Sequence, residues 1–336
     1  MRFLKTMGIV WLIAAGFALG PAAEAETTSV VVAHQYGLAY LPLMVMREQK
    51  LLEQQAKAAG LGDVAVTYAT MSGPGLINDG LISGTVQFGA VGPPSLVTLW
   101  AKTKGRLGVK AAGGLAAMPM YLNSIDPAVK TLADFSEKDK IALPTAKVSV
   151  QAVTLQMAAA KAFGRDKWDA LDRFTVSMAH PDALVAMMSG KSEVIGHFGS
   201  APFQYQELED KRVHRLLNSY DVLGGPATFN VVWTLKKFHD DNPKIFGAFI
   251  APLAEAMTLI KASPSRAATI YIDAEKSKMA VNAVEQIIRD PENVFTTTPQ
   301  NIMKYANFMH KVGTVEHLPE SWKDLFFSEI HPAAGS

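Results

Sequence analysis

Residues 76–90 have the sequence LINDGLISGTVQFGA, and residues 183–196 repeat its pattern as ALVAMMSGKSEVIG. Each stretch predicts a helix, a Ser-Gly stop and then a buried strand, because glycine ends helices and short apolar runs suit strands. One such unit in each half of the chain is what two similar α/β lobes would produce. The same order of helix, Ser-Gly and strand also occurs in proteins without a repeat, so the pattern favours two lobes without establishing them.

Strands and helices are predicted to alternate on both sides of these two units. The predicted strands lie at 29–33, 64–68, 86–91, 141–143, 174–178, 194–198 and 213–217. Such alternation indicates a parallel sheet with helices on both faces. Predicted helices include 41–59, with a break near Gln49, and 181–188, and the chain beyond residue 242 is predicted to be mainly helical. Apolar β-type stretches at 109–122 and 228–234 predict the crossovers between the lobes.

The N-terminus has the pattern of an export signal. Arg2 and Lys5 precede an uncharged, mostly apolar run at residues 7–20, and Ala23-Glu24-Ala25 is a small-x-small cleavage pattern. The alternative is a membrane anchor, but this run is shorter than the roughly 20 residues that a bilayer core requires. We therefore expect residues 1–25 to be a signal peptide, with a mature periplasmic protein that starts at Glu26.

The composition excludes several classes of partner and site. The chain has no cysteine, which rules out disulfides, thiolate metal sites and a lipid-modified cysteine anchor. It has 32 basic and 31 acidic residues, and removing residues 1–25 leaves equal numbers of each, which argues against nucleic acid and anionic membranes as partners. The apolar stretch 245–260 contains Pro252 and Glu255 and is expected to be a core helix. We expect a freely diffusing monomer.

Five segments, in order, carry a family resemblance. They are the strand 29–33 followed by Leu41-Pro42-Leu43-Met44-Val45, the unit 81–89, Gly92-Pro93-Pro94, residues 129–135 and Ala201-Pro202-Phe203. In this order and spacing the chain resembles the substrate-binding proteins of ABC importers of the nitrate, sulfonate and taurine type, which share their fold with the thiamine-pyrimidine-precursor binders. No single motif is diagnostic, but the resemblance covers most of the chain after residue 25.

The resemblance implies a type II periplasmic-binding fold, in which two doubly wound α/β lobes enclose a ligand cleft. It places residues 26–118 and 228–336 in lobe 1, with a helical C-terminal region, and residues 119–227 in lobe 2. It also implies the solute-binding component of an ABC importer, which captures a small molecule by cleft closure and delivers it to a permease at the inner membrane. A sulfonate, a nitrate-like anion and a heterocyclic compound all stay open as ligands.

Candidate ligand residues follow from the rule that open parallel sheets bind ligands at the carboxyl ends of their strands. In lobe 1 they are His34, Gln35, Tyr36, Tyr40, Met71, Ser72, Gly73 and the Gly92-Pro93-Pro94 turn, of which Pro93 is the main candidate. In lobe 2 they are Thr145, Ser149, Gln151, His197 and Phe198, while Lys147 would neutralise an anion if it faced the cleft. Free N–H groups at helix starts near these loops favour an anionic ligand.

Structural roles compete with these assignments. Ser72 and Ser149 are equally good as plain helix N-caps, and Pro93 suits the first turn of a helix. The two tyrosines can pack in the core, and the two histidines can be ordinary polar loop residues. We expect at least one tyrosine with Ser72 to meet the ligand from lobe 1, and Ser149 or His197 from lobe 2.

No catalytic motif is present in the sequence. There is no Gly-x-Ser-x-Gly, His-Glu-x-x-His, P-loop or strand-linked Gly-x-Gly-x-x-Gly, and the eight histidines lack metal-ligand spacing. We therefore expect no catalytic residue, metal or cofactor. A periplasmic sensor for a signalling receptor is the main alternative. A pyrimidine-precursor-type enzyme on the same fold is the other, against which export and the absence of cysteine argue.

Overall fold

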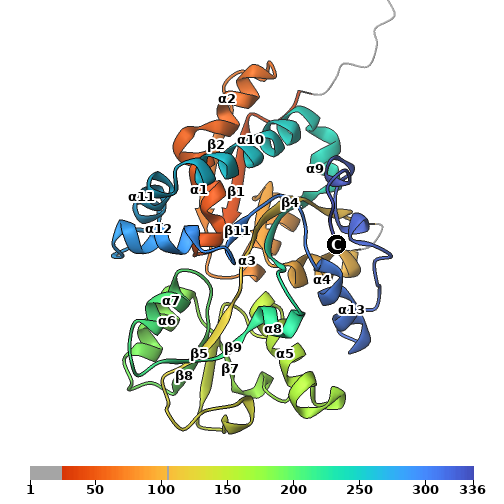
Figure 1. Ribbon diagram of the computed structural model, residues 1–336. Coiled ribbons are helices and arrows are strands. Elements are labelled where there is room, and N and C mark those ends of the chain that lie inside the picture. The colour runs from red at the N-terminus through yellow and green to blue at the C-terminus, as the bar shows by residue number, and fades with distance from the viewer. Residues whose placement is uncertain (1–24, 104–105) are drawn as a thin grey trace, which may run out of the picture.

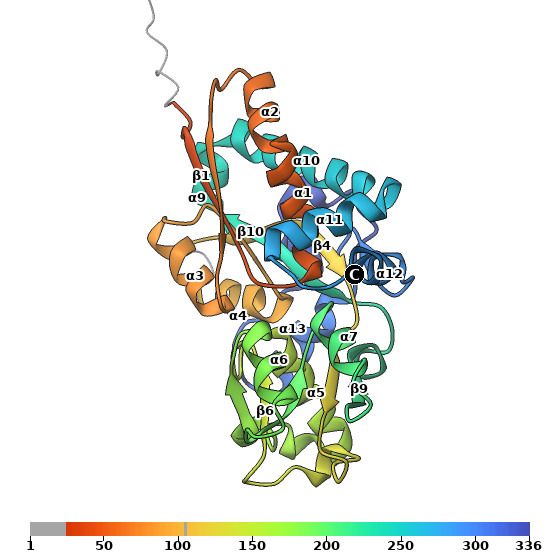
Figure 2. The ribbon, with the colours of Figure 1, turned by 90° about the vertical axis from the view of Figure 1, so that its left-hand side faces the viewer.

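The computed structural model describes residues 25–103 and 106–336, which form two β-sheets flanked by helices (Figure 1). The predicted signal peptide therefore lies outside the described residues, except for Ala25. We call the part built around the six-stranded sheet lobe 1 and the part built around the five-stranded sheet lobe 2. Figure 2 shows lobe 1 above lobe 2 after a turn of 90°. This arrangement confirms the predicted α/β fold with two lobes.

The strands of lobe 1 lie in the order β11-β4-β10-β3-β1-β2. They are β1 Ser29–His34, β2 Ala65–Thr70, β3 Phe88–Val91, β4 Val109–Ala117, β10 Thr228–Leu235 and β11 Val294–Phe295. The strands of lobe 2 lie in the order β7-β6-β8-β5-β9. They are β5 Tyr121–Ser124, β6 Lys140–Leu143, β7 Thr175–Ser177, β8 Val194–Phe198 and β9 His214–Asn218.

The helices follow the predicted alternation. They are α1 Leu41–Gln49, α2 Leu51–Ala58, α3 Pro74–Ser83, α4 Pro93–Thr103, α5 Val150–Phe163, α6 His180–Met188, α7 Phe203–Leu208, α8 Ser219–Leu223, α9 Lys236–Asp241, α10 Pro243–Ala262, α11 Pro264–Glu275, α12 Val281–Arg289 and α13 Ile302–Lys311. The predicted break near Gln49 is confirmed, because Lys50 between α1 and α2 has the left-handed backbone conformation.

The repeated sequence pattern corresponds to a repeated structure. Helix α3, Gly84 and β3 in lobe 1 match α6, Gly190 and β8 in lobe 2, and both glycines have positive φ, at 78° and 62°. Strand β1 pairs in parallel with β2 and β3, just as β6 pairs in parallel with β7 and β8. The two lobes therefore share one βα topology, as the sequence pattern indicated.

The prediction of parallel sheets is wrong for β10 in lobe 1 and β5 in lobe 2, and the short edge strand β11 is also antiparallel to β4. Strand β10 is antiparallel to β3 and β4, and β5 is antiparallel to β8 and β9. Each of these strands enters its sheet from the other lobe. It therefore starts on the side of the sheet where the neighbouring parallel strands have their carboxyl ends, and it runs in the opposite direction.

The chain passes between the sheets at residues 118–120, from β4 to β5, and at residues 224–227, from α8 to β10. The first connection lies inside the predicted crossover stretch 109–122, and the second directly precedes the stretch at 228–234. The division into 26–118 with 228–336 and 119–227 stays a prediction for the two moving bodies.

Helix α10 is long and apolar enough to cross a membrane by length and composition, and half of its most apolar 18-residue stretch is buried. It packs on α1 and α2. Its Phe249 stacks on Phe88 of β3 with ring centroids 3.9 Å apart. These contacts match the prediction of a core helix.

Candidate functional site

A small cavity lies between the two lobes, where strands of both sheets end. Lobe 1 lines it with Gln35, Tyr36, Tyr40, Pro74, Gly92, Ser95 and Phe229, and lobe 2 lines it with Pro144, Ser149, Val150, Gln151 and His180. The cavity volume is about 10 Å³, which is close to the minimum that holds one water molecule. In this conformation the lobes are therefore closed on the site, and a larger ligand requires them to separate.

The lobe 1 wall is uncharged and aromatic. The Gln35 side-chain amide donates to the Tyr40 hydroxyl at 3.0 Å, and the His34 ring stacks behind Tyr40 with centroids 5.7 Å apart. Burial lowers the pKa of His34 to about 4, so this ring is neutral near pH 7. Burial also raises the pKa of Tyr40. This wall offers amide and hydroxyl groups and no ionised side chain.

The lobe 2 wall is the first turn of α5 together with the start of α6. Ser149 is the N-cap of α5, and its hydroxyl accepts from the Ala152 amide at 3.2 Å. Gln151 lies two residues further along the chain, with its side-chain nitrogen 3.2 Å from His180 Nε2. Ser149 therefore caps a helix and lines the cavity at the same time, which joins the two roles that its sequence context suggested.

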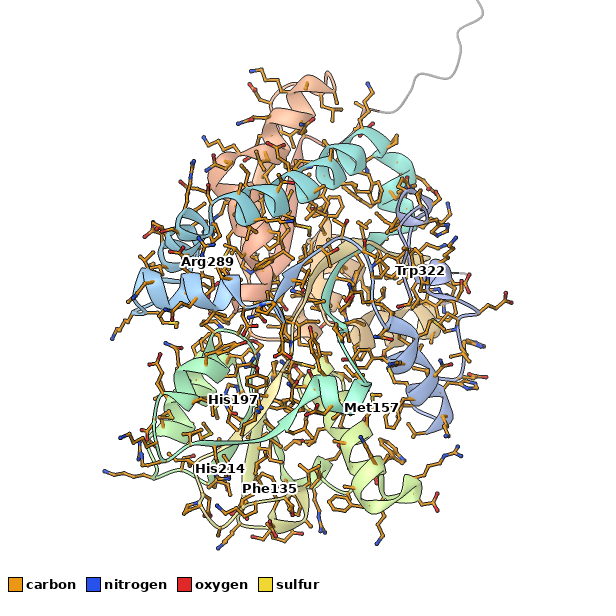
Figure 3. The ribbon with its side chains drawn as sticks, in the orientation of Figure 1. Phe135, Met157, His197, His214, Arg289 and Trp322 are labelled. Atoms are coloured by element: carbon orange, nitrogen blue, oxygen red, sulfur yellow. The ribbon has the colours of Figure 1, made fainter. Side chains whose placement is uncertain are left out.

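A buried chain of side chains leads from this wall into lobe 2. His180 Nδ1 lies 2.8 Å from His197 Nε2, and His197 Nδ1 is hydrogen-bonded to Glu207 Oε1. The other carboxyl oxygen of Glu207 accepts from the Asn123 amide at 2.8 Å. Figure 3 shows His197 in the upper part of lobe 2, close to lobe 1. Burial, and next the neighbouring His197, hold the pKa of His180 well below its usual range.

Helices α3, α4, α5 and α6 all begin at the cavity. Pro74, Val150 and His180 are the first residues of three of them and line it, and Gly92 and Ser95 line it at the start of α4. Helix starts carry partial positive charge and free N–H groups, except that the prolines in the first turns of α3, α4 and α6 have no N–H. Among the described residues, no lysine, arginine, aspartate or glutamate lines this cavity. The arrangement suits a negatively charged or strongly polar group of modest size.

The lobes touch closely around the site. The Leu38 amide donates to the Ala201 carbonyl at 2.8 Å, and the Ser95 hydroxyl donates to the Val148 carbonyl at 3.1 Å. Gly92 meets Val150 so closely that a Cβ atom at Gly92 would lie 2.6 Å from the Val150 Cβ. A glycine at this position therefore permits the closed contact.

The structure brings together a subset of the predicted site residues. Those that line the cavity are Gln35, Tyr36, Tyr40, Ser149 and Gln151. Ser72, Gly73 and Thr145 line a separate, more open groove between α3 and α6, beside Asp79 and Asp182. Ser72 is not an N-cap, because Gly73 occupies that position of α3.

The other predicted residues lie behind the walls. His34 and Pro93 are buried next to lining residues, and the Met71 amide donates to the His34 carbonyl. His197 and Phe198 are both 0% exposed. Neither lines the cavity in this closed conformation, because β8 buries both side chains, and His197 is linked to the cavity through His180.

Several residues that line the cavity were not predicted from the sequence. They are Pro74, Ser95, Pro144, Val150, His180 and Phe229. His180 lies three residues after the end of β7, so the strand-end rule selects it once α6 is known to begin one residue before Pro181. Phe229 lies on a crossover strand that comes from the other lobe, and no local signal marks it.

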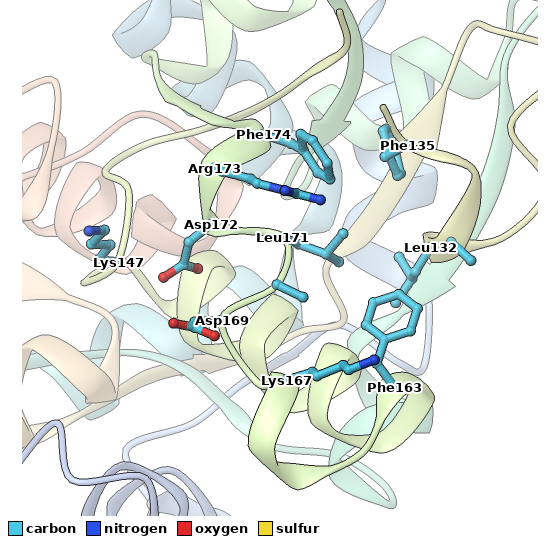
Figure 4. Close-up of a pocket in the computed structure, with 12 residues that line it drawn as sticks. Leu132, Phe135, Lys147, Phe163, Lys167, Asp169, Leu171, Asp172, Arg173 and Phe174 are labelled. Atoms are coloured by element: carbon cyan, nitrogen blue, oxygen red, sulfur yellow. The ribbon is translucent and has the colours of Figure 1, made fainter. Parts of the chain in front are cut away.

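A larger groove of about 780 Å³ lies on lobe 2 alone (Figure 4). Its walls include Phe135, Phe163 and Leu171, and Lys147 lies beside Asp172 at one end. Lys147 therefore faces this groove and not the cavity between the lobes. All its lining residues come from lobe 2. Closure of the lobes would therefore add no contact from lobe 1 to a molecule bound there.

Comparison with known proteins shows similarity in structure and not in sequence. No protein-family model matches the chain, and no curated protein matches it. Several solved structures match almost its whole length. The alkanesulfonate-binding protein SsuA from Xanthomonas axonopodis pv. citri, bound to MOPS, has a TM-score of 0.68 at 14% identity, and the match covers 91% of this chain and 99% of that one.

The second match is the periplasmic nitrate-binding protein NrtA from Synechocystis PCC 6803, with a TM-score of 0.69 at 14% identity over 92% of this chain and 86% of that one. The chain has the periplasmic-binding-protein fold. A further match is the aliphatic sulphonate-binding protein SsuA from Escherichia coli, with a TM-score of 0.66 at 13% identity over 90% and 93% of the two chains. In this periplasmic-binding-protein fold, the cavity described above lies between the lobes.

Proposed function

We propose that this protein is the periplasmic solute-binding component of an ABC importer. It captures a small molecule between the lobes and presents it to a permease at the inner membrane. The observation that carries this proposal is the cavity itself, whose walls come from strand ends and helix starts of both lobes. The similar structures support it, because they are described as binding proteins for alkanesulfonates and nitrate.

The proposed ligand is a small organic monoanion of the sulfonate type. Four helix starts supply partial positive charge for the anionic end, and N–H groups are available only at those first-turn positions that are not proline. Tyr36, Phe229 and Val150 supply apolar surface for the organic part, which favours a sulfonate over bare nitrate. A neutral heterocycle is the second candidate, because aromatic walls also suit a ring.

Closure of the lobes is the proposed mechanism. Hinge rotation around a ligand is the known motion of periplasmic binding proteins, and the two connections at 118–120 and 224–227 are the proposed hinge. A ligand shifts the equilibrium only by its differential affinity for the closed form. Contacts from Tyr40 or Gln35 on one side, and Ser149 or Gln151 on the other, form together only when the lobes meet.

The cavity lacks a catalytic arrangement. The Ser95 hydroxyl donates to the Val148 carbonyl, and Ser149 caps α5. His180 bonds to Gln151 and His197, so neither serine is paired with it as a nucleophile. This supports binding without turnover. A periplasmic sensor would use the same closed form, and identification of the protein that recognises it distinguishes the two roles.

Native mass spectrometry of protein purified from the periplasm of its host tests the proposal. We expect a retained small molecule, with a mass that matches a sulfonate or a similar monoanion. Calorimetry with that molecule should then give one site per chain. A protein that carries no molecule and binds no member of a panel of sulfonates, nitrate and heterocycles would contradict the proposal.

A further inference from the structure

We propose that a clasp outside the cavity joins the two lobes and keeps part of the protein closed even without a ligand. The clasp consists of Tyr205 and Tyr220 of lobe 2 and the turn 290–293 of lobe 1. These residues do not line the cavity. The inference rests on the proposed closure of the lobes, and it adds a set of residues that affects ligand binding only through the balance between open and closed forms.

The hydroxyl group of Tyr205 lies between two side chains of the turn. It donates to Asp290 Oδ2 at 3.2 Å and accepts from the Asn293 side-chain amide, also at 3.2 Å. Tyr205 belongs to α7 and the turn follows α12, and Figure 1 shows α7 of lobe 2 directly below α12 of lobe 1. Burial raises the pKa of Tyr205, so its hydroxyl keeps its proton at pH 7. One hydroxyl therefore acts as donor and acceptor toward the other lobe.

Tyr220 reaches the same turn from a second helix of lobe 2. It lies on α8 and is 7% exposed. Its hydroxyl donates to the Glu292 carbonyl at 3.1 Å. Two helices of lobe 2 thus hold one four-residue turn of lobe 1.

The turn is fixed within lobe 1 by its own hydrogen bonds. The Glu292 amide donates to Asp290 Oδ1 at 2.9 Å, and Asn293 Nδ2 donates to the Ile287 carbonyl at 2.8 Å. The next residue, Val294, pairs with β4 as part of β11. The acceptor of Asp290 and the donor of Asn293 are therefore in place before Tyr205 meets them, which lowers the entropy lost when the clasp forms.

Tyr205 is fixed within lobe 2 through its neighbour Gln204, whose side chain is fully buried. The Gln204 amide donates to the Pro119 carbonyl at 3.0 Å and accepts from the Tyr121 amide at 2.9 Å. Helix α7 therefore holds the first connection between the lobes at both of these residues.

Tyr220 is fixed to the same connection through Ser219. The Ser219 hydroxyl accepts from the Met120 amide at 2.8 Å, and the Ser219 amide donates to the Met120 carbonyl at 2.9 Å. Residues 119–121 are thus held to α7 and α8, so the rotation of this connection takes place before residue 119. The clasp joins two bodies on opposite sides of that point, and separation of the lobes must change it.

The clasp shifts the balance between the two forms by an amount typical of one hydrogen bond. In the open form the Tyr205 hydroxyl, Asp290 and Asn293 bond to water, so only the net difference counts. Loss of the Tyr205 hydroxyl should therefore lower the ratio of closed to open protein by about 3–30-fold. Where the open form dominates, ligand affinity falls in proportion to the closed fraction.

Distances between two spin labels in ligand-free protein test the inference. The chain has no cysteine, so Asp79→Cys and Asp182→Cys give one label on each lobe, at the groove between α3 and α6. Both positions are exposed, and their helices follow the edge strands β2 and β7, away from the connections. The protein is unfolded, dialysed and refolded to remove any retained molecule, and the distances are measured by pulsed electron paramagnetic resonance.

We expect a short and a long distance in the wild type, from the closed and the open form. Tyr205→Phe should lower the ratio of short to long by about 3–30-fold. Tyr220→Phe should change it in the same direction, and it provides a second test should Tyr205→Phe fail to refold. Tyr68→Phe is the matched control, because Tyr68 lies within lobe 1 on β2 and its buried hydroxyl has no hydrogen-bond partner among the described residues; it should keep the wild-type ratio.

The same short-to-long ratio in the wild type, Tyr205→Phe and Tyr220→Phe would overturn the clasp. So would a wild type that shows only one of the two distances. Because the measurement uses no ligand, either result leaves solute binding intact. Failure of the proposed function would appear separately, as the absence of a retained molecule and of binding to the ligand panel.

Discussion

Replacement of Gly92 by alanine tests how closely the lobes meet at the cavity. A Cβ atom at Gly92 would lie 2.6 Å from Val150 Cβ and 2.9 Å from Val150 Cγ1, across the boundary between the lobes. Carbon atoms in ordinary contact are about 3.5–4.0 Å apart, so the added methyl group needs about 1 Å more than the closed form offers.

Val150 has little freedom to move aside. It is buried at the first position of α5, and a β-branched side chain is stiff about χ1 in a helix. Overpacking of this kind costs about 1–3 kcal/mol, which corresponds to a loss of ligand affinity of about 5–150-fold. The cost falls on the closed form only, because separated lobes do not bring Gly92 and Val150 together. Gly92 does not have positive φ, so alanine adds no backbone strain.

Calorimetry with the retained ligand compares the wild type, Gly92→Ala and the control Gly75→Ala. A Cβ atom at Gly75 meets nothing within 4 Å, so this control should bind within about twofold of the wild type. The unfolding free energy of ligand-free Gly92→Ala should stay within about 0.5 kcal/mol of the wild type. Wild-type affinity in Gly92→Ala would refute the conclusion that Gly92 and Val150 meet in the ligand-bound form.

Four other predictions concern the site, its surroundings and the N-terminus. Ser149→Gly should weaken binding of an anion by about 10–150-fold through the lost hydrogen bond, with only a few tenths of a kcal/mol lost in stability, whereas Ser149→Ala should also lose about 0.5–2 kcal/mol from the α5 cap; equal affinities for Ser149→Gly and wild type in calorimetry would contradict this. Ser72→Ala changes only the groove between α3 and α6, so this variant should bind the retained ligand within about twofold of the wild type. N-terminal sequencing of periplasmic protein should begin at Glu26, and retention of residues 1–25 would contradict the signal peptide. The retained ligand should be recovered unchanged after long incubation, and steady consumption abolished by Gln151→Ala would contradict the absence of turnover.

The alternation of strands and helices was predictable from the sequence because its signals are local. Alternating apolar strands, the glycines after α3 and α6, and the break at Lys50 each depend on a few neighbouring residues. The antiparallel direction of β5 and β10 was not predicted, because it depends on which lobe each strand enters and not on its own residues.

The candidate site was predictable in part for a similar reason. Gln35 and Ser149 follow β1 and β6, which are interior strands of their sheets, and the strand-end rule places them at the cavity. Ser72 follows the edge strand β2 and lines the groove between α3 and α6 instead. Phe229 and the partners of His197 depend on how the lobes and α7 pack, which local sequence does not reveal.

The central claim is that both lobes hold one ligand and close on it. Small-angle X-ray scattering of the mature protein, with and without saturating retained ligand, tests this most directly. The account predicts a smaller radius of gyration in the presence of ligand, and a smaller change for Gly92→Ala. An unchanged radius of gyration, together with wild-type affinity in a variant that lacks the Ser149 and Gln151 side chains, would contradict it.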